Sequence, residues 1–324
     1  MTSFIKLKKY LYTILFTGLS LYSIAQKTTN STEQLPFGDM NKWMVRVVDE
    51  SFVIGGDTKY LYEITQGDTL KDNTPYKPSI SPWATSTVMA KVSGVYKASV
   101  TVFPEKRGDG YCARLETRME HVKVLGLINI SVLATGTIFF GEVIEPVRDT
   151  KNPQGKLNHN IPFIKRPKAL VFDYKVSPQG EQIKATGFSS IEKIAEQNNA
   201  EACLLLQYRW EDAEGNIFAK RVGTAYERYN KEVDEWQNAH RITINYGDIS
   251  QESFFQPYMN LIKGANRPHC LNSQGEMVPI QEVGWATADT QPTHIVLRFS
   301  SGHGGAYIGA PDAKFWLDNV KLVY

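Results

Sequence analysis

A glycine-rich stretch near the C-terminus raises the first chemical question. Gly302-His303-Gly304-Gly305 could cradle a phosphate, because the backbone N–H groups of such loops bind anions when a helix follows. The next regular segment is instead 315–324, which alternates apolar and polar residues with period two and predicts a strand. We therefore predict that these glycines form a corner between two strands and bind no nucleotide.

Carboxylates could hydrolyse a glycosidic bond if two of them stood roughly 5–9.5 Å apart. No clear pair exists, and there is no Gly-x-Ser-x-Gly elbow for a serine nucleophile. Glu116 alternates with Arg114 and Arg118, which predicts an ion pair on one strand face. We interpret the other acids as solvated surface. They are Glu142, Glu145, Glu211 and Asp212.

Three cysteines, Cys112, Cys203 and Cys270, allow at most one disulfide within the chain, and their redox state is left open. Cys112 and Cys203 stand in strand-like runs, so we interpret them as buried small apolar residues. His269-Cys270 are neighbours only in sequence, which is a weak basis for a nucleophile pair. No Cys/His spacing typical of a metal site occurs.

Aromatic rings are the residues that could recognise a sugar, because they stack on its C–H faces. Of the six tryptophans, Trp83 follows Pro82 in a polar loop and is the best candidate for an exposed platform. Trp236 lies in a charged stretch and is the second. Trp210 is the third, although it shares a strand face with apolar residues and could be core. Trp43 and Trp316 are predicted to be core, and Trp285 is undecided.

A structural Ca²⁺ is the one cofactor that the sequence suggests. The first and last strands would bring Asp39 and Asp318 to positions where such an ion could tie them together. Calcium takes six to eight oxygen ligands, and two carboxylates are too few without backbone carbonyls. The alternative is that Asp318 belongs only to the polar face of an edge strand.

The elements that must position these residues are strands. Period-two runs separated by turn signals predict roughly ten strands, and no sustained helical periodicity occurs. The predicted fold is all-β, an antiparallel jelly-roll-like β-sandwich with long loops and at most one or two short helices. Segment 190–198 could be a short helix, and 226–238 a helix or a hairpin arm. The longest predicted loops are 146–168 and 247–290.

The N-terminus predicts export. Three lysines precede the uncharged apolar run 11–24, and small residues before Gln26 offer a cleavage site, so 1–25 reads as a signal peptide. No cysteine follows that could carry a lipid anchor, and we expect a periplasmic or secreted protein with no membrane span after cleavage. Without the three lysines, 33 basic residues face 34 acidic ones, which excludes an electrostatic case for nucleic acid.

Several motifs follow one another along the chain. They are the opening 37–43, the Leu-Glu-Thr strand 113–117, the middle segments 135–141, 161–163 and 166–175, and the close 315–324. In this order they resemble the family named "putative carbohydrate metabolism domain", found in exported proteins of Bacteroidota-type bacteria. The resemblance covers 37–324, and 26–36 would be a linker before this single domain. The family implies a jelly-roll-like sandwich and carbohydrate binding or processing, with no catalytic residue that can be carried over.

We therefore expect an exported carbohydrate-binding β-sandwich that captures a polysaccharide or oligosaccharide. Two alternatives stay open: a glycoside hydrolase on the same fold, and a structural or assembly protein of the cell envelope. The sugar and the oligomeric state do not follow from the sequence.

Overall fold

The structure is a computed structural model that describes residues 31–124, 128–187 and 189–324. Residues 31–324 form one compact unit. The signal peptide predicted for 1–25 lies outside the described residues. Within them, strands dominate and the helices are four 3₁₀ turns, η1 Phe52–Ile54, η2 Pro153–Lys156, η3 Pro257–Met259 and η4 Gly264–Asn266. The prediction of an all-β sandwich is confirmed.

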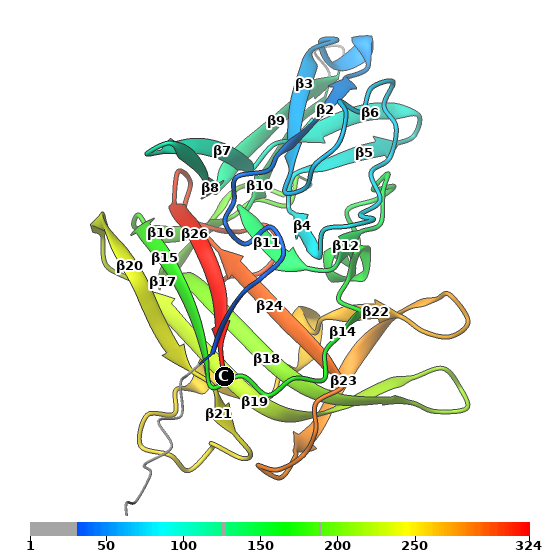
Figure 1. Cartoon of the computed structure of the whole chain (residues 1–324). Coiled ribbons are helices and arrows are strands. Elements are labelled where there is room, and N and C mark those ends of the chain that lie inside the picture. Colours follow the sequence, from blue (N-terminus) through cyan, green and yellow to red (C-terminus); the bar gives the residue numbers. More distant parts are fainter. Residues whose placement is uncertain (1–30, 125–127, 188) are drawn as a thin grey trace, which may run out of the picture. The chain divides into compact units, whose positions relative to one another are not determined.

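One layer is a six-stranded antiparallel sheet with the order β20-β15-β26-β8-β7, and β1 added beside β26. The C-terminal strand lies inside this sheet, with β15 on one side and β8 on the other (Figure 1). The strands are β1 Thr32–Gln34, β7 Val102–Arg107, β8 Gly110–Glu116, β15 Ala169–Ser177, β20 Val233–Thr243 and β26 Lys314–Val323.

The second layer is an eleven-stranded sheet with the order β12-β13-β22-β23-β19-β18-β24-β11-β4, to which β14 and β21 are attached. Its pairs are antiparallel except β13–β22 and β19–β23. The strands are β4 Trp83–Thr85, β11 Thr137–Phe140, β12 Glu142–Val143, β13 Leu157–Asn158, β14 Ile161–Pro162, β18 Ala200–Glu211, β19 Ile217–Tyr229, β21 Asn245–Tyr246, β22 His269–Leu271, β23 Met277–Trp285 and β24 His294–Ser300.

This sheet is a nearly closed barrel, because one segment of chain contributes to both of its ends. β11 pairs with β24, and after a bend at Gly141 the chain continues as β12 and pairs with β13. Gly141 has φ +151°, and a Cβ there would lie 2.2 Å from the carbonyl oxygen of Asn158. Only glycine fits at this bend, so it is a position on which barrel closure depends.

Three hairpins and a small three-stranded sheet complete the fold. The hairpins are β2–β3, β5–β6 and β9–β10, and the small sheet has the order β17-β16-β25. The strands are β2 Met44–Asp49, β3 Thr58–Glu63, β5 Val88–Val92, β6 Val95–Ser99, β9 Arg118–Val124, β10 Ile128–Ala134, β16 Glu181–Lys184, β17 Glu192–Gln197 and β25 Ile308–Gly309.

The main hydrophobic core fills the space between the two large sheets. β15 and β26 contribute Phe172 and Phe315, while β18 and β24 contribute Leu204 and Phe299, and all four side chains have no exposed surface. The opposite face of β18 and β19 looks into the barrel. It carries a smaller apolar cluster and several buried polar side chains.

Several local predictions were wrong. Segment 190–198 contains strand β17 rather than a helix. For 226–238 the hairpin-arm alternative is confirmed, because this segment belongs to β19 and β20. The first predicted strand, which carries Asp39, was expected beside the last strand, but β1 occupies that place. β1 lies within the stretch 26–36 that we expected to be a linker. Ordered structure therefore begins before residue 37.

The glycine-rich stretch 302–305 is a corner, as predicted. It connects β24 to the short strand β25, and no helix follows it. Gly305 has φ +82°, a conformation that glycine adopts without strain.

Candidate functional site

An exposed row of aromatic rings, Tyr208, Trp210 and Phe218, lies on the outer face of the β18–β19 hairpin. We call it the aromatic strip. Tyr208 is 44% exposed and Trp210 is 38% exposed. The Trp210 and Phe218 rings lie 5.7 Å apart and are tilted by only 22°, while Tyr208 lies 6.1 Å from Trp210. The strip thus presents adjacent rings to solvent on a rigid hairpin.

The strip continues a strand face that is core elsewhere. Leu204 and Leu206 share its face on β18 and are fully buried in the main core. These apolar neighbours are the reason that the sequence analysis ranked Trp210 only third among the candidates. Figure 1 shows the β18–β19 hairpin running out beyond β15 and β26, so the end of the same face has no opposing sheet.

Polar side chains border the aromatic strip. Lys220 is the cross-strand partner of Tyr208, and Gln281 of β23 is the partner of Phe218. The nearby carboxylate of Glu211 is bound by the backbone N–H and the hydroxyl of Ser273, at 3.0 and 2.6 Å. The strip can therefore offer rings, an amine and an amide to a ligand.

The first tryptophan candidate is placed differently from the expectation. Trp83 has no exposed surface; its ring packs edge-on against Phe140 at 4.5 Å, and its Nε1 donates to the carbonyl of Pro36 at 2.8 Å. The prediction of an exposed platform is wrong, because the polar residues around Trp83 belong to a short strand that β11 and the main core cover.

The second candidate, Trp236, is half-buried on the outer face of the six-stranded sheet. The guanidinium of Arg107 lies 3.8 Å from its ring centroid. Trp316 also lies on this outer face, with its Nε1 donating to Glu105 and Lys175 at 4.7 Å over the ring, so the prediction that it is core was wrong. Cations cover both rings and leave little face for a ligand.

The two residues predicted as calcium ligands, Asp39 and Asp318, each contact a protein side chain. Arg107 Nη1 donates to Asp318 at 2.7 Å and to Asp173 at 2.8 Å, and Asn41 Nδ2 donates to Asp39 at 3.3 Å. Burial raises the pKa of Asp318, despite the hydrogen bond from Arg107. The guanidinium of Arg107 thus supplies the positive charge beside Asp318 and Asp173. In the described part of the chain, no group of three Asp, Glu, His or Cys residues could hold a metal.

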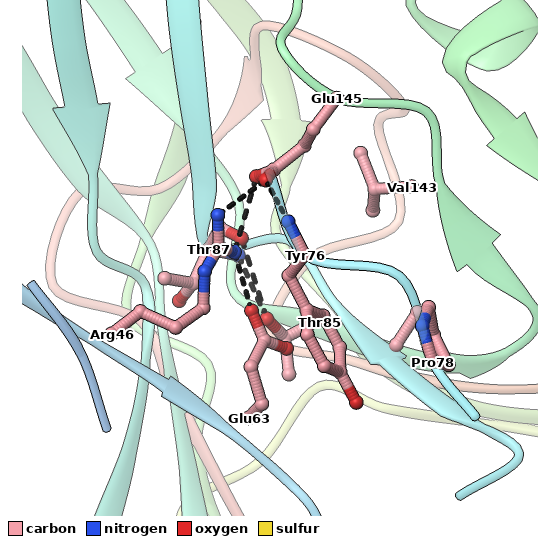
Figure 2. Close-up of a pocket in the computed structure, with 9 residues that line it drawn as sticks. Arg46, Glu63, Tyr76, Pro78, Thr85, Thr87, Val143 and Glu145 are labelled. Atoms are coloured by element: carbon pink, nitrogen blue, oxygen red, sulfur yellow. Dashed lines mark hydrogen bonds and ion pairs between the residues drawn. The ribbon is translucent and has the colours of Figure 1, made fainter. Parts of the chain in front are cut away.

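A buried ion cluster escaped the sequence analysis. Arg46 Nη1 donates to Glu63 at 2.7 Å, and both terminal nitrogens of Arg46 donate to Glu145 (Figure 2). Glu145 also accepts backbone N–H groups from Tyr76 and Met89. The side chains of the three charged residues are at most 4% exposed. A cation inside the apolar strand Met44–Asp49 was the available signal.

Two carboxylates share one guanidinium in this cluster. Burial raises the pKa of Glu63 to about 7, because Arg46 offsets the cost of desolvating its charge only in part and Glu145 adds repulsion. The cavity beside the cluster measures about 10 Å³, which is room for one water. The cluster therefore joins β2–β3 to the segment after β12 and offers no space to a substrate.

A cleft of about 780 Å³ opens between two hairpins and the barrel. Hairpins β5–β6 and β9–β10 form one wall, and the barrel-side face of β18, β19 and β24 forms the other. The second wall carries Glu201, which Arg298 Nη2 contacts at 2.5 Å and the Tyr226 hydroxyl at 2.5 Å. Arg298 and Arg228 keep the pKa of Glu201 below its usual value, although burial alone would raise it.

The cysteines and histidines show no activated nucleophile. All three cysteines are buried and free, as predicted for Cys112 and Cys203. Burial raises the pKa of Cys203 to about 12 and also raises that of Cys270, which disfavours a thiolate.

The predicted ion pair of Glu116 with Arg114 is present, at 2.9 Å.

Comparison with known structures gives distant neighbours, two of which are described here. No protein-family model matches the chain, and no curated protein matches it. A "putative glycoside hydrolase" from Bacteroides thetaiotaomicron is 15% identical with TM-score 0.48, over 86% of this chain and 70% of that one. A "putative glycoside hydrolase" from Bacteroides vulgatus is 14% identical with TM-score 0.36, over 90% and 94%. Likeness at this level carries no functional argument.

Proposed function

We propose that the protein binds carbohydrate through the aromatic strip. The observation that carries the proposal is the exposure of Trp210 and Tyr208 on one rigid hairpin face, with Phe218 beside them. Rings of this kind can stack on the apolar faces of pyranoses, and the polar side chains beside them can read hydroxyl groups. The resemblance to the carbohydrate family and the predicted Trp210 contact support the same reading.

Binding is favoured over hydrolysis at this surface. Glu211, a carboxylate beside the strip on β18, is held by the backbone N–H and the hydroxyl of Ser273, and hydrolysis requires a second acid facing the same bond. A glycan bound flat on an open sheet face would also leave the scissile bond in water. The hydrolase alternative therefore has less support here than capture of a polysaccharide or oligosaccharide.

The experiment is a glycan array with the protein from residue 26 onward, followed by titration of any glycan found. Trp210→Ala should weaken binding by about 10- to 100-fold, or roughly 1.4–2.8 kcal/mol, with little change in melting temperature. The reason is that stacking covers apolar ring surface that folding leaves exposed.

Trp236→Ala is the matched control, because Arg107 already covers that ring. It should leave glycan affinity unchanged. Loss of binding in Trp236→Ala with none in Trp210→Ala would move the site to the six-stranded sheet. Absence of any glycan ligand would favour the alternative of an envelope structural or assembly protein, for which the strip would be a protein contact.

We also propose that residues 1–25 direct export, on the basis of their lysines and apolar run. Mass spectrometry of the N-terminus of the mature protein would test this proposal. No helix among the described residues has the length and apolar character needed to cross a bilayer.

A further inference from the structure

The cleft between the hairpins and the barrel has one wall made mainly of aliphatic side chains. In hairpin β5–β6, Met89 and Ala98 point away from the cleft into a buried cluster. Because side chains alternate along a strand, the residues next to them point into the cleft. This wall contains no aromatic ring. Its apolar side chains are Val88, Ala90 and Val92 of β5, Val95 of β6, Val122 of β9, and Ile130 and Val132 of β10. Lys97, Ser99 and Glu120 of the same hairpins also line the cleft.

An aliphatic wall of this kind selects its ligand. Sugar hydroxyls turned toward it would lose hydrogen bonds to water without replacement, and the rings that line the cleft, among them Phe139, Tyr226 and Tyr307, belong to its other parts. A hydrocarbon chain, in contrast, gains from contact with it in proportion to the area covered. The cleft volume lies in the range of small-molecule sites.

The opposite wall holds an excess of positive charge. Glu201 is paired with both Arg298 and Arg228, at 2.5 and 3.4 Å, so two guanidinium groups face one carboxylate. The Arg298 side chain is 22% exposed, and it lines the cleft. The other charges in the lining are paired, with Lys97 between Glu50 and Glu120 and Lys156 beside Asp149, apart from Lys263 at the exposed rim.

An unpartnered hydrogen-bond donor accompanies this excess. Arg298 Nε has no hydrogen-bond partner among the described residues, and its residue lines the cleft. Buried polar groups normally find partners, so this N–H group points to a ligand that carries an acceptor.

An apolar loop stands at one end of the cleft. Phe52 of η1 is 91% exposed and Val53 is 38% exposed, while the adjacent Ile54 lines the cleft. Two hydrogen bonds between Ser51 and Tyr96 fix this loop to β6. Exposed apolar side chains continuous with an apolar wall suit the entry of a water-insoluble molecule.

We propose that the cleft binds an amphipathic monoanion of the fatty acid class, with its chain along the aliphatic wall and its carboxylate at Arg298. This site is separate from the aromatic strip and does not depend on carbohydrate binding. The carboxylate would balance the excess charge of the Arg298–Glu201–Arg228 cluster and accept the free N–H of Arg298. The aliphatic chain would cover the valines and isoleucine of the hairpins.

The test is calorimetric titration of the protein with hexadecanoate, 1-hexadecanol and shorter fatty acids, each below its solubility limit. We expect one saturable site for hexadecanoate, at least tenfold tighter than for the alcohol. Affinity should fall by up to about fourfold for each buried methylene removed. Equal affinity for acid and alcohol, or no saturable binding, would overturn the proposal.

Variants separate the two walls. Ala90→Trp should fill the cleft and abolish binding of both hexadecanoate and the alcohol, whereas Ala288→Trp, at an exposed loop position outside the lining, should change neither. Arg298→Met should reduce the preference for acid over alcohol to about one, and Arg298→Lys should retain most of it. Unchanged binding in Ala90→Trp would place the ligand elsewhere and refute the site, even if Arg298→Met fails to fold.

A last arm distinguishes a free fatty acid from a membrane surface. Vesicles of phosphatidylglycerol present the same combination of chain and monoanion. Co-sedimentation with these vesicles that Phe52→Ser abolishes, with no binding of free hexadecanoate, would show a membrane contact and overturn the proposal. Trp210→Ala should leave hexadecanoate affinity unchanged, so failure of the carbohydrate proposal and failure of this one can be told apart.

Discussion

The Arg46 cluster predicts an unusual dependence of stability on pH, which Glu63→Gln should remove. Glu63 and Glu145 share one buried guanidinium, so the cluster would carry a net negative charge if both acids were ionised. With Glu63 protonated the cluster is neutral, in agreement with a pKa of about 7 for Glu63 against 4.5 in an exposed chain.

The sign follows from where the proton resides. Below pH 4.5, Glu63 holds its proton in both the folded and the unfolded states. Between 4.5 and 7 only the folded state keeps it, so the unfolding free energy falls as pH rises, and above 7 the loss is complete. At about 1.36 kcal/mol per pH unit, this group should remove about 3 kcal/mol of stability across the window.

The assay is urea denaturation of the wild type and Glu63→Gln between pH 4.5 and 8, followed by tryptophan fluorescence. The difference between the two proteins cancels the titration of all other groups. A glutamine keeps the carbonyl that accepts from Arg46 but cannot ionise. We expect near-equal stability at pH 4.5 and a variant that is more stable than the wild type, by up to about 3 kcal/mol, at pH 8.

Glu145→Gln is the control. Glu145 accepts from both terminal nitrogens of Arg46 and from the N–H groups of Tyr76 and Met89, so an amide NH₂ would face donors. That variant should lose about 3–5 kcal/mol at every pH, as expected when one member of a buried ion cluster is removed. A Glu63→Gln variant less stable than the wild type at pH 8 would show that ionised Glu63 stabilises the fold, and the reasoning would be wrong.

Two further predictions concern the core and the N-terminus. Trp83→Ala should cost about 3–5 kcal/mol of stability without a selective effect on a glycan ligand, because the ring is fully buried against Phe140. Denaturation and glycan titration of the same sample would check this. A folded variant as stable as the wild type would contradict the burial of the ring. Mass spectrometry of the protein from its native host should find a mature start at Gln26, and an intact Met1 would refute export through cleavage.

The sequence was informative where local chemistry decides the structure. Period-two patterns identified the strands of the sandwich, since alternating side chains need one buried face. The corner at 302–305 followed from a strand rather than a helix after the glycines. The Glu116–Arg114 pair followed from their spacing on one face, and the burial of Cys112 and Cys203 from their apolar surroundings.

The sequence could not decide which face of a strand is buried. In β26, Phe315 and Leu317 enter the core while Trp316 between them faces outward, and both choices fit the pattern. Asn319, with φ +52°, then shifts the alternation so that Val320 and Leu322 also face the core. An alternating pattern indicates only that the two faces of a strand differ. The face that an opposing sheet covers is the one that becomes buried. For this reason Trp83 is buried and Trp210 is exposed.

The choice of charge partners also belonged to the tertiary structure. Arg46 meets Glu145 from 99 residues away, and Arg298 meets Glu201 across 97. A lone charged residue in an apolar strand signals that a partner exists, because an unpaired buried charge is too costly to keep. Such a residue does not indicate which distant strand supplies the partner, because the two charges become buried and close to each other only when the sheets pack.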